Sequence, residues 1–378
     1  MIHPDCFQRP WLQQQAEALG VRPNNLQFLE RCIHALELVS RLSDADLDFV
    51  FKGGTSLVLL LNPVRRLSID VDIATTEPIE RIKAVLNQVA MYRPPFLRYE
   101  HQEKRDRDAP PTRHFKVYFN SAAGQQAESY VLLDVITTGH SYPVTERRSI
   151  AAPFIKLETD SHVVLPTIDC LLGDKLAAFA PTTIGVLYDP LDRNGKPRER
   201  DPLQIVKQLF DVGNLFPEAT NLNQVDDTYR ATFETQNHYR GGGFNLEQCL
   251  DDTIEAARAL CLAPSNQTAT HTPHQTILRS GQRGLASHLL TEPFTFDRHA
   301  RVAASRAALL ATLIKYRMVS ELPKNLAQRV PAAADLGRIQ LSEENAGLQA
   351  VLRPLSPEAL YYWSMIEDVI ALNRDASP

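Results

Sequence analysis

The spacing of apolar residues changes along the chain, from a helical repeat to short strand-like runs. Residues 11–41 carry apolar side chains at helical spacing, as at Leu26, Leu29 and Ile33, and therefore predict helices. Between residues 48 and 137 short β-like runs replace them, separated by turn or helix signals. The strand-like runs are FVFKGG (49–54), SIDVDIA (68–74), RHFKVYFN (113–120) and SYVLLDVIT (129–137), with a helix-like run at 77–90. This mixture predicts an α/β (α+β) core.

Beyond about residue 167 the strand signals fade and amphipathic helical patterns take over. The predicted helices span residues 167–180, 202–216, 245–262, 299–318 and 356–373. Two segments rich in turn residues, 189–202 and 265–275, are expected to be exposed loops. We therefore predict two domains: residues 1–165 with N-terminal helices and the α/β core, and residues 166–378 as a mostly helical C-terminal region.

Composition excludes several classes of protein. With 378 residues and 44% apolar content the chain can fill the cores of two to three domains, and a net charge of -5 does not fit a strongly basic nucleic-acid binder. The five cysteines are far apart and form no CxxC pair, which argues against a disulfide framework or zinc site. The N-terminus lacks a signal-peptide pattern, and no apolar stretch is long enough to cross a membrane. We expect a cytoplasmic protein.

A glycine pair follows the first predicted strand. Gly53 and Gly54 permit close backbone approach to a phosphate, and Thr55 can cap a following helix whose N-terminal amides attract an anion. The alternative is a structural turn that needs glycine only for its backbone conformation.

Asp70 and Asp72 carry the strongest local signal. In a strand both carboxylates point to one face while Val71 points to the other. Like charges on one strand face repel, so a divalent cation such as Mg²⁺ is the simplest explanation. The alternative is an edge strand with a solvated polar face.

Asp134 interrupts an apolar run, residues 131–136, of the kind expected for a strand buried on both faces. A lone buried carboxylate is costly. If this strand lies beside that of Asp70, Asp134 becomes a third carboxylate that assists metal binding and accepts a proton. The alternatives are a partly exposed strand end or an aspartate bonded to a nearby arginine.

These motifs resemble a known family. Gly53-Gly54-Thr55-Ser56 followed by Asp70-Val71-Asp72 is similar to the GG[ST] plus DxD signature of the DNA polymerase β nucleotidyltransferase superfamily, and more narrowly to its AbiEii/AbiGii and MenT-like toxin branch. The resemblance covers roughly residues 48–216. It implies a polymerase β-type core with a mixed sheet, an NTP substrate, Mg²⁺ or Mn²⁺ held by Asp70, Asp72 and Asp134, and nucleotide contacts from Gly53, Gly54, Thr55 and Ser56.

Two later residues also match the family pattern. Lys175 resembles the lysine that contacts the triphosphate, and Asp211 the family's late aspartate. The alternatives are a snorkelling lysine and a solvated pair of Asp211 with Lys207. Arg66, just before the aspartates, is a candidate phosphate contact, with a solvated loop as the alternative.

The resemblance implies a nucleotidyltransferase that is the toxin of a toxin–antitoxin pair, with a tRNA 3′ end as acceptor and a cognate antitoxin as partner. Two alternatives stay open. The acceptor could be a protein hydroxyl, or the chain could be a non-catalytic nucleotide-binding or RNA-binding module. Leu172 and Gln208 replace a lysine and an aspartate of the family pattern and favour the second alternative. The sequence does not indicate an oligomeric state.

Overall fold

The computed structural model describes residues 1–102, 111–124, 126–192, 194–266, 270–290, 293–320 and 332–376. The chain forms two compact units. The first comprises Met1–Thr167 with Ser287–Glu292, and the second Ile168–Ala286 with Pro293–Pro378. Within the described ranges, no helix is both long enough and apolar enough to cross a membrane.

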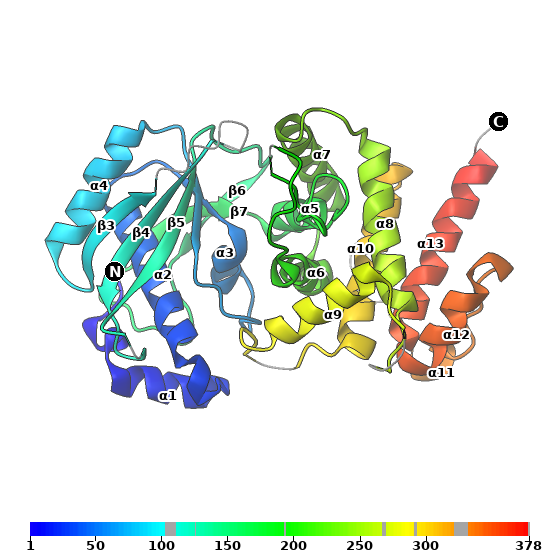
Figure 1. The fold of residues 1–378 in the computed structure, drawn as a ribbon, viewed down its shortest axis with the longest axis horizontal. Helices are drawn as coiled ribbons and strands as arrows, with labels where there is room; N and C mark the ends of the chain where they lie inside the picture. Colours follow the sequence, from blue (N-terminus) through cyan, green and yellow to red (C-terminus); the bar gives the residue numbers. More distant parts are fainter. Residues whose placement is uncertain are drawn as a thin grey trace. The chain divides into compact units, whose positions relative to one another are not determined.

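The first unit is built on a five-stranded mixed sheet (Figure 1). Its helices are α1 (Arg9–Leu19), α2 (Leu26–Asp44), α3 (Gly53–Leu60) and α4 (Ile79–Tyr92). The sheet strands are β1 (Val50–Lys52), β2 (Val71–Ala74), β3 (Phe96–Gln102), β4 (Thr112–Asn120) and β5 (Glu128–Ile136), in the order β1-β2-β5-β4-β3. Only β2 and β5 pair in parallel; the other neighbours are antiparallel. The predicted α/β core with a mixed sheet is confirmed.

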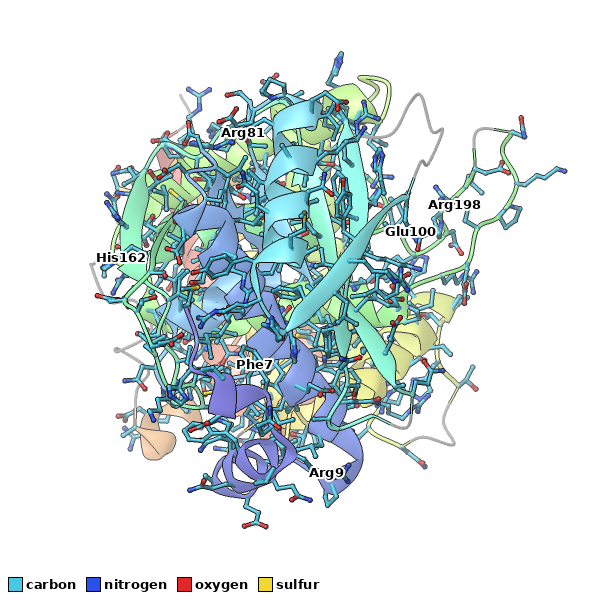
Figure 2. The ribbon with its side chains drawn as sticks, turned by 90° about the vertical axis from the view of Figure 1, so that its left-hand side faces the viewer. Phe7, Arg9, Arg81, Glu100, His162 and Arg198 are labelled. Atoms are coloured by element: carbon cyan, nitrogen blue, oxygen red, sulfur yellow. The ribbon has the colours of Figure 1, made fainter. Side chains whose placement is uncertain are left out.

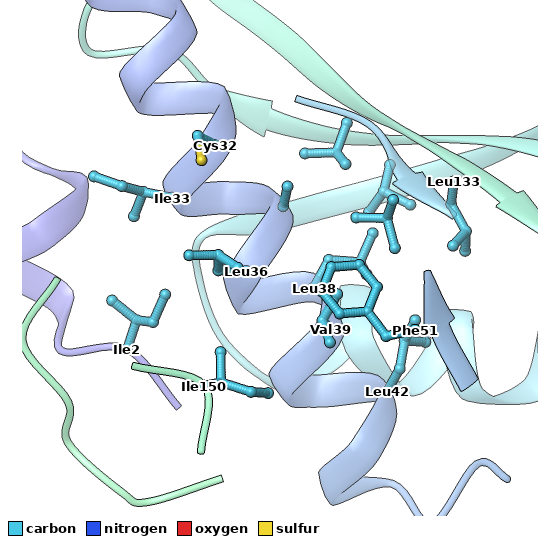
Figure 3. Packing of buried hydrophobic residues seen from close by; sticks show 14 of the residues in the cluster. Ile2, Cys32, Ile33, Leu36, Leu38, Val39, Leu42, Phe51, Leu133 and Ile150 are labelled. Carbon is cyan, nitrogen blue, oxygen red and sulfur yellow. The ribbon is translucent and has the colours of Figure 1, made fainter. Parts of the chain in front are cut away.

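One face of this sheet forms the core. Leu36, Val39 and Leu42 of α2 pack with Phe51 of β1 and Leu133 of β5 in a single apolar cluster (Figure 3). Along β4 and β5 buried side chains alternate with partly exposed ones, because successive side chains of a strand point to opposite faces. The prediction that the Asp134 strand is buried on both faces is therefore wrong. Its second face remains partly open and is free to carry polar groups.

Local predictions around the glycine pair need correction. The helix α3 begins at Gly53 with Lys52 as its N-cap, so Thr55 lies inside the first turn and does not cap it. Strand β2 begins at Val71, so Asp70 precedes the strand. The structure adds a hairpin that the sequence did not predict, formed by β6 (Thr145–Ser149) and β7 (His162–Pro166).

The second unit is largely helical among its described residues, as predicted. Its helices are α5 (Ile168–Ala178), α6 (Pro202–Leu215), α7 (Leu222–Tyr239), α8 (Leu246–Leu262), α9 (Pro273–Leu285), α10 (Arg301–Lys315), α11 (Ala333–Leu336), α12 (Ala346–Leu355) and α13 (Pro357–Ala376). The sequence predicted α5, α6, α8, α10 and α13 but missed α7, α9, α11 and α12. The loop predicted at 265–275 is wrong at its end, where Thr272 and Gln275 form the capping box of α9, and residues 267–269 lie outside the described residues.

A buried histidine makes the stability of the first unit depend on pH. His34 of α2 stacks on Phe119 with ring centroids 3.6 Å apart, and its Nδ1–H donates to the Glu30 carbonyl. Burial lowers the pKa of His34 to about 3. Below pH 6.5 the unfolded chain binds a proton that the folded chain excludes, so stability is lost as the pH falls from 6.5 toward 3.

We predict that His34→Phe, which keeps an aromatic ring on Phe119, weakens this dependence. Between pH 7.5 and pH 5 the free energy of unfolding of the wild type should fall by about 2 kcal/mol more than that of the variant. Urea denaturation at both pH values measures the difference. Parallel losses in the two proteins would contradict a neutral His34.

Candidate active site

Four titratable side chains lie in one row across the sheet. Lys52 of β1 is the register partner of Asp72 on β2, and Asp72 is the partner of Asp134 on β5. Asp134 is in turn the partner of His114 on β4. Directly opposite residues on neighbouring strands project from the same face. All four are partly exposed, whereas Ile73 on the other face is fully buried. The open face therefore gathers two carboxylates between a lysine and a histidine.

The Asp72 carboxylate lies against the backbone of Gly53. A Cβ at residue 53 would overlap Asp72 Oδ2, and Gly53 has a φ of +78°, in the left-handed region. Glycine is thus required here for two reasons: any other side chain would be strained, and it would displace the carboxylate. This contact joins the glycine turn to the aspartate strand.

The first turn of α3 is held by its own hydroxyl groups. Thr55 Oγ1 donates to the Asp70 carbonyl at 2.5 Å, and Ser56 Oγ donates to the Gly53 carbonyl at 2.8 Å. Both residues are fully buried. The predicted nucleotide contacts of Thr55 and Ser56 thus fall on hydroxyls with structural partners. The N–H groups of the first helical turn are the groups that a helix start offers to an anion.

Arg66 lies beside the same turn. A Cβ at Gly54 would be 2.5 Å from Arg66 Nη2 and 2.9 Å from Ser68 Oγ. Arg66 is 6% exposed and forms an isolated β-bridge with Leu289. The alternative of a solvated loop is therefore wrong for Arg66. Gly54 provides the space in which a buried guanidinium approaches the start of α3.

Asp134 is fixed by a partner that the sequence analysis missed. His114 Nδ1 lies 2.6 Å from Asp134 Oδ1, and the two side chains are 21% and 26% exposed. The strand pattern of residues 113–120 already places His114 on a polar face, but only the β4–β5 register brings it to Asp134. The arginine partner considered as an alternative for Asp134 is replaced by this histidine.

A divalent cation fits the pair of Asp72 and Asp134 better than the predicted set of three aspartates, which also includes Asp70. Asp70 is half-buried and precedes β2, and its carbonyl is bound by Thr55. Within the described ranges, no three His, Cys, Asp or Glu side chains stand in an arrangement that could hold a metal ion. Mg²⁺ usually takes one or two carboxylates and completes its shell with water and substrate phosphates. The Asp72–Asp134 pair offers that number.

Lys175 and Asp211 come together within the second unit. Lys175 Nζ on α5 is 3.6 Å from Asp211 Oδ2 on α6, and the side chains are 8% and 1% exposed. Lys207 is also buried. Both alternatives, a snorkelling Lys175 and a solvated pair of Asp211 with Lys207, are therefore wrong. Burial removes both charges of this pair from water, which costs free energy unless each group also has well-placed hydrogen-bond partners.

The contact of Gly53 with Asp72 predicts a stability effect. Gly53→Ala should lower the free energy of unfolding by at least about 1–2 kcal/mol, the cost of a left-handed backbone with a side chain. Gly243→Ala is the matched control, because Gly243 has open space around its Cβ position and should change stability by less than about 0.5 kcal/mol. Urea denaturation measures both; equal losses would contradict the assignment.

Comparison with known proteins identifies the family. The model of the AbiEii nucleotidyl transferase toxin of type IV toxin–antitoxin systems matches residues 37–313, well over half of the chain. No curated protein matches the chain. A solved structure, the nucleotidyltransferase toxin MenT4 from Mycobacterium tuberculosis H37Rv, aligns over 96% of this chain and 98% of its own at 12% identity and a TM-score of 0.47. The chain belongs to the AbiEii family and is a nucleotidyltransferase toxin of a type IV toxin–antitoxin system.

Proposed function

We propose that this nucleotidyltransferase moves a nucleotide from an NTP to the 3′ end of a tRNA, using the row of Asp72 and Asp134 beside the start of α3. The observation that carries the proposal is the shared register of the two aspartates on parallel strands. Family membership implies the NTP substrate and a cognate antitoxin. The tRNA acceptor rests on the resemblance to the MenT-like branch.

The residues of the row fit a divalent cation. Because Gly53 has no Cβ, the Asp72 carboxylate can occupy the space beside the start of α3. Asp72 and Asp134 would hold Mg²⁺, or Mn²⁺ in its place. When bound, the ion would neutralise charge on the triphosphate and on the transferring phosphoryl group. Oxygen ligands from the substrate would complete its shell.

The chain itself positions the reactants. The first-turn amides of α3 at Gly53 and Gly54 bind triphosphate oxygens, and the Arg66 guanidinium beside them supplies positive charge. The acceptor hydroxyl oxygen forms a bond to the α-phosphorus. The bond between the α-phosphorus and the oxygen that bridges it to the β-phosphate breaks, and pyrophosphate leaves. Asp134 accepts the hydroxyl proton. Catalysis is positioning plus stabilisation of charge on the phosphates.

Thr55, Ser56, Lys175 and Asp211 take supporting roles in this proposal. The Thr55 and Ser56 hydroxyls hold the geometry of the α3 turn, so that its amides face the phosphates. For Lys175, the family resemblance implies a contact with the triphosphate, which a lysine makes as a point charge. Asp211 holds Lys175 Nζ at 3.6 Å and so orients it.

Incubation of the purified chain with each α-labelled NTP, Mg²⁺ and total RNA tests the proposal. We expect label on small RNA of tRNA size, abolished by EDTA. Asp72→Asn should lower the rate by at least about 100-fold, because a lost metal-ligand carboxylate removes several kcal/mol of transition-state stabilisation.

Asp160→Asn serves as the control for this change. Its exposed carboxylate is bound by Ser149 at the hairpin of β6 and β7, outside the row, so the rate should stay at the wild-type level. Label on polypeptide in place of RNA would redirect the proposal to a protein acceptor. A wild type without Mg²⁺-dependent label, or an unaffected Asp72→Asn variant, would overturn it.

A further inference from the structure

A close contact between an imidazole and a carboxylate lies on the open face of the sheet. His114 and Asp134 are register partners on β4 and β5, with Nδ1 and Oδ1 2.6 Å apart. We infer that His114 is a positioning residue, which fixes the Asp134 carboxylate for the transfer reaction. The inference rests on the proposed function, because it assigns a role to the same carboxylate.

The chemistry of the two groups determines the direction of the hydrogen bond. An ionised carboxylate only accepts hydrogen bonds, so His114 Nδ1 must carry the proton and donate it. A neutral imidazole in this tautomer places its lone pair on Nε2. The hydrogen bond from His114 therefore occupies one carboxylate oxygen of Asp134. The other oxygen remains for a cation or for the acceptor hydroxyl.

His114 differs from the histidines that serve packing. His34 stacks on Phe119 at 3.6 Å, and His101 stacks on Phe115 at 4.7 Å. Those two phenylalanines are fully buried on the core face of β4. His114 projects from the opposite face, with 21% of its side chain exposed. The side chain of His114 does not help to fill the core, and its contact with Asp134 is what it contributes to the row.

Asp134 needs such a partner because its neighbour in the row repels it. Asp72 stands at the same register on the adjoining strand. Without the His114 donor, the carboxylate of Asp134 would be free to change its rotamer. Donors that hold metal-binding carboxylates typically contribute about 10- to 100-fold in affinity or activity. His114 thus fixes the orientation of the Asp134 carboxylate within the row.

A pair of substitutions tests the inference. His114→Leu removes the donor, whereas His114→Asn places an amide N–H close to the position of Nδ1. We expect His114→Leu to lower kcat by about 10- to 100-fold with little change in KM for the NTP, because the α3 turn is untouched. His114→Asn should restore most of kcat. The affinity for Mn²⁺ alone, measured by calorimetric titration, should follow the same order.

A second readout needs no turnover. Nitrogen-15 NMR of the imidazoles in the full chain should show the Nδ1–H tautomer for His114, and Asp134→Ala should remove that preference. His101→Leu is the matched control, since it removes a sheet histidine that does not contact Asp134; its kcat should equal that of the wild type. Thermal unfolding of every variant separates misfolding from mispositioning.

The outcomes distinguish the two proposals. If the wild type transfers no nucleotide, the proposed function fails, and the tautomer measurement still tests the contact. If the wild type is active and His114→Leu matches it in kcat and Mn²⁺ affinity, the positioning role is overturned. Equal loss in His114→Leu and His114→Asn, with unchanged melting temperatures, would also overturn it, because the amide donor would then have no effect.

Discussion

In the first unit β2 and β5 run parallel, and their register sets Asp72 beside Asp134. Neighbouring strands lie about 4.8 Å apart, so two carboxylates at one register on the same face repel each other. Lys52 on one side and His114 on the other supply donors to the row. The row therefore sets two carboxylates side by side between two groups that can donate hydrogen bonds.

The glycine turn depends on the same pair. Because Asp72 lies against the backbone of residue 53, the turn between β1 and α3 has no room for a side chain there. The next residue, Gly54, is equally constrained by Arg66. The start of α3 therefore lies between a carboxylate and a guanidinium. This arrangement places a carboxylate and a guanidinium against neighbouring glycines of one turn.

Alternation along single strands was readable from the sequence, and pairing between strands was not. The pattern around Asp72 predicted its open face, and the family motifs predicted the fold class. The contact of His114 with Asp134 depends on the β4–β5 register, which no local pattern encodes. The burial of Arg66 depends on Leu289, more than two hundred residues later in the chain. The hairpin of β6 was missed because TERRS (145–149) is polar and has no buried residue.

Helices of the second unit also show that contacts between elements could not be predicted from the sequence. Helix α7 buries only Val225, Thr228, Tyr229 and Phe233 of its 18 residues, too few apolar positions to mark it in the sequence. A solvated pair of Asp211 with Lys207 was one alternative for α6, yet Asp211 is 1% exposed and lies 3.6 Å from Lys175 of α5. Replacing a buried ion pair with apolar residues is often neutral or stabilising, so stability alone gives little reason to keep it. The packing of α5 against α6 therefore decides that these two charged residues are buried, and the polarity of either helix does not encode it.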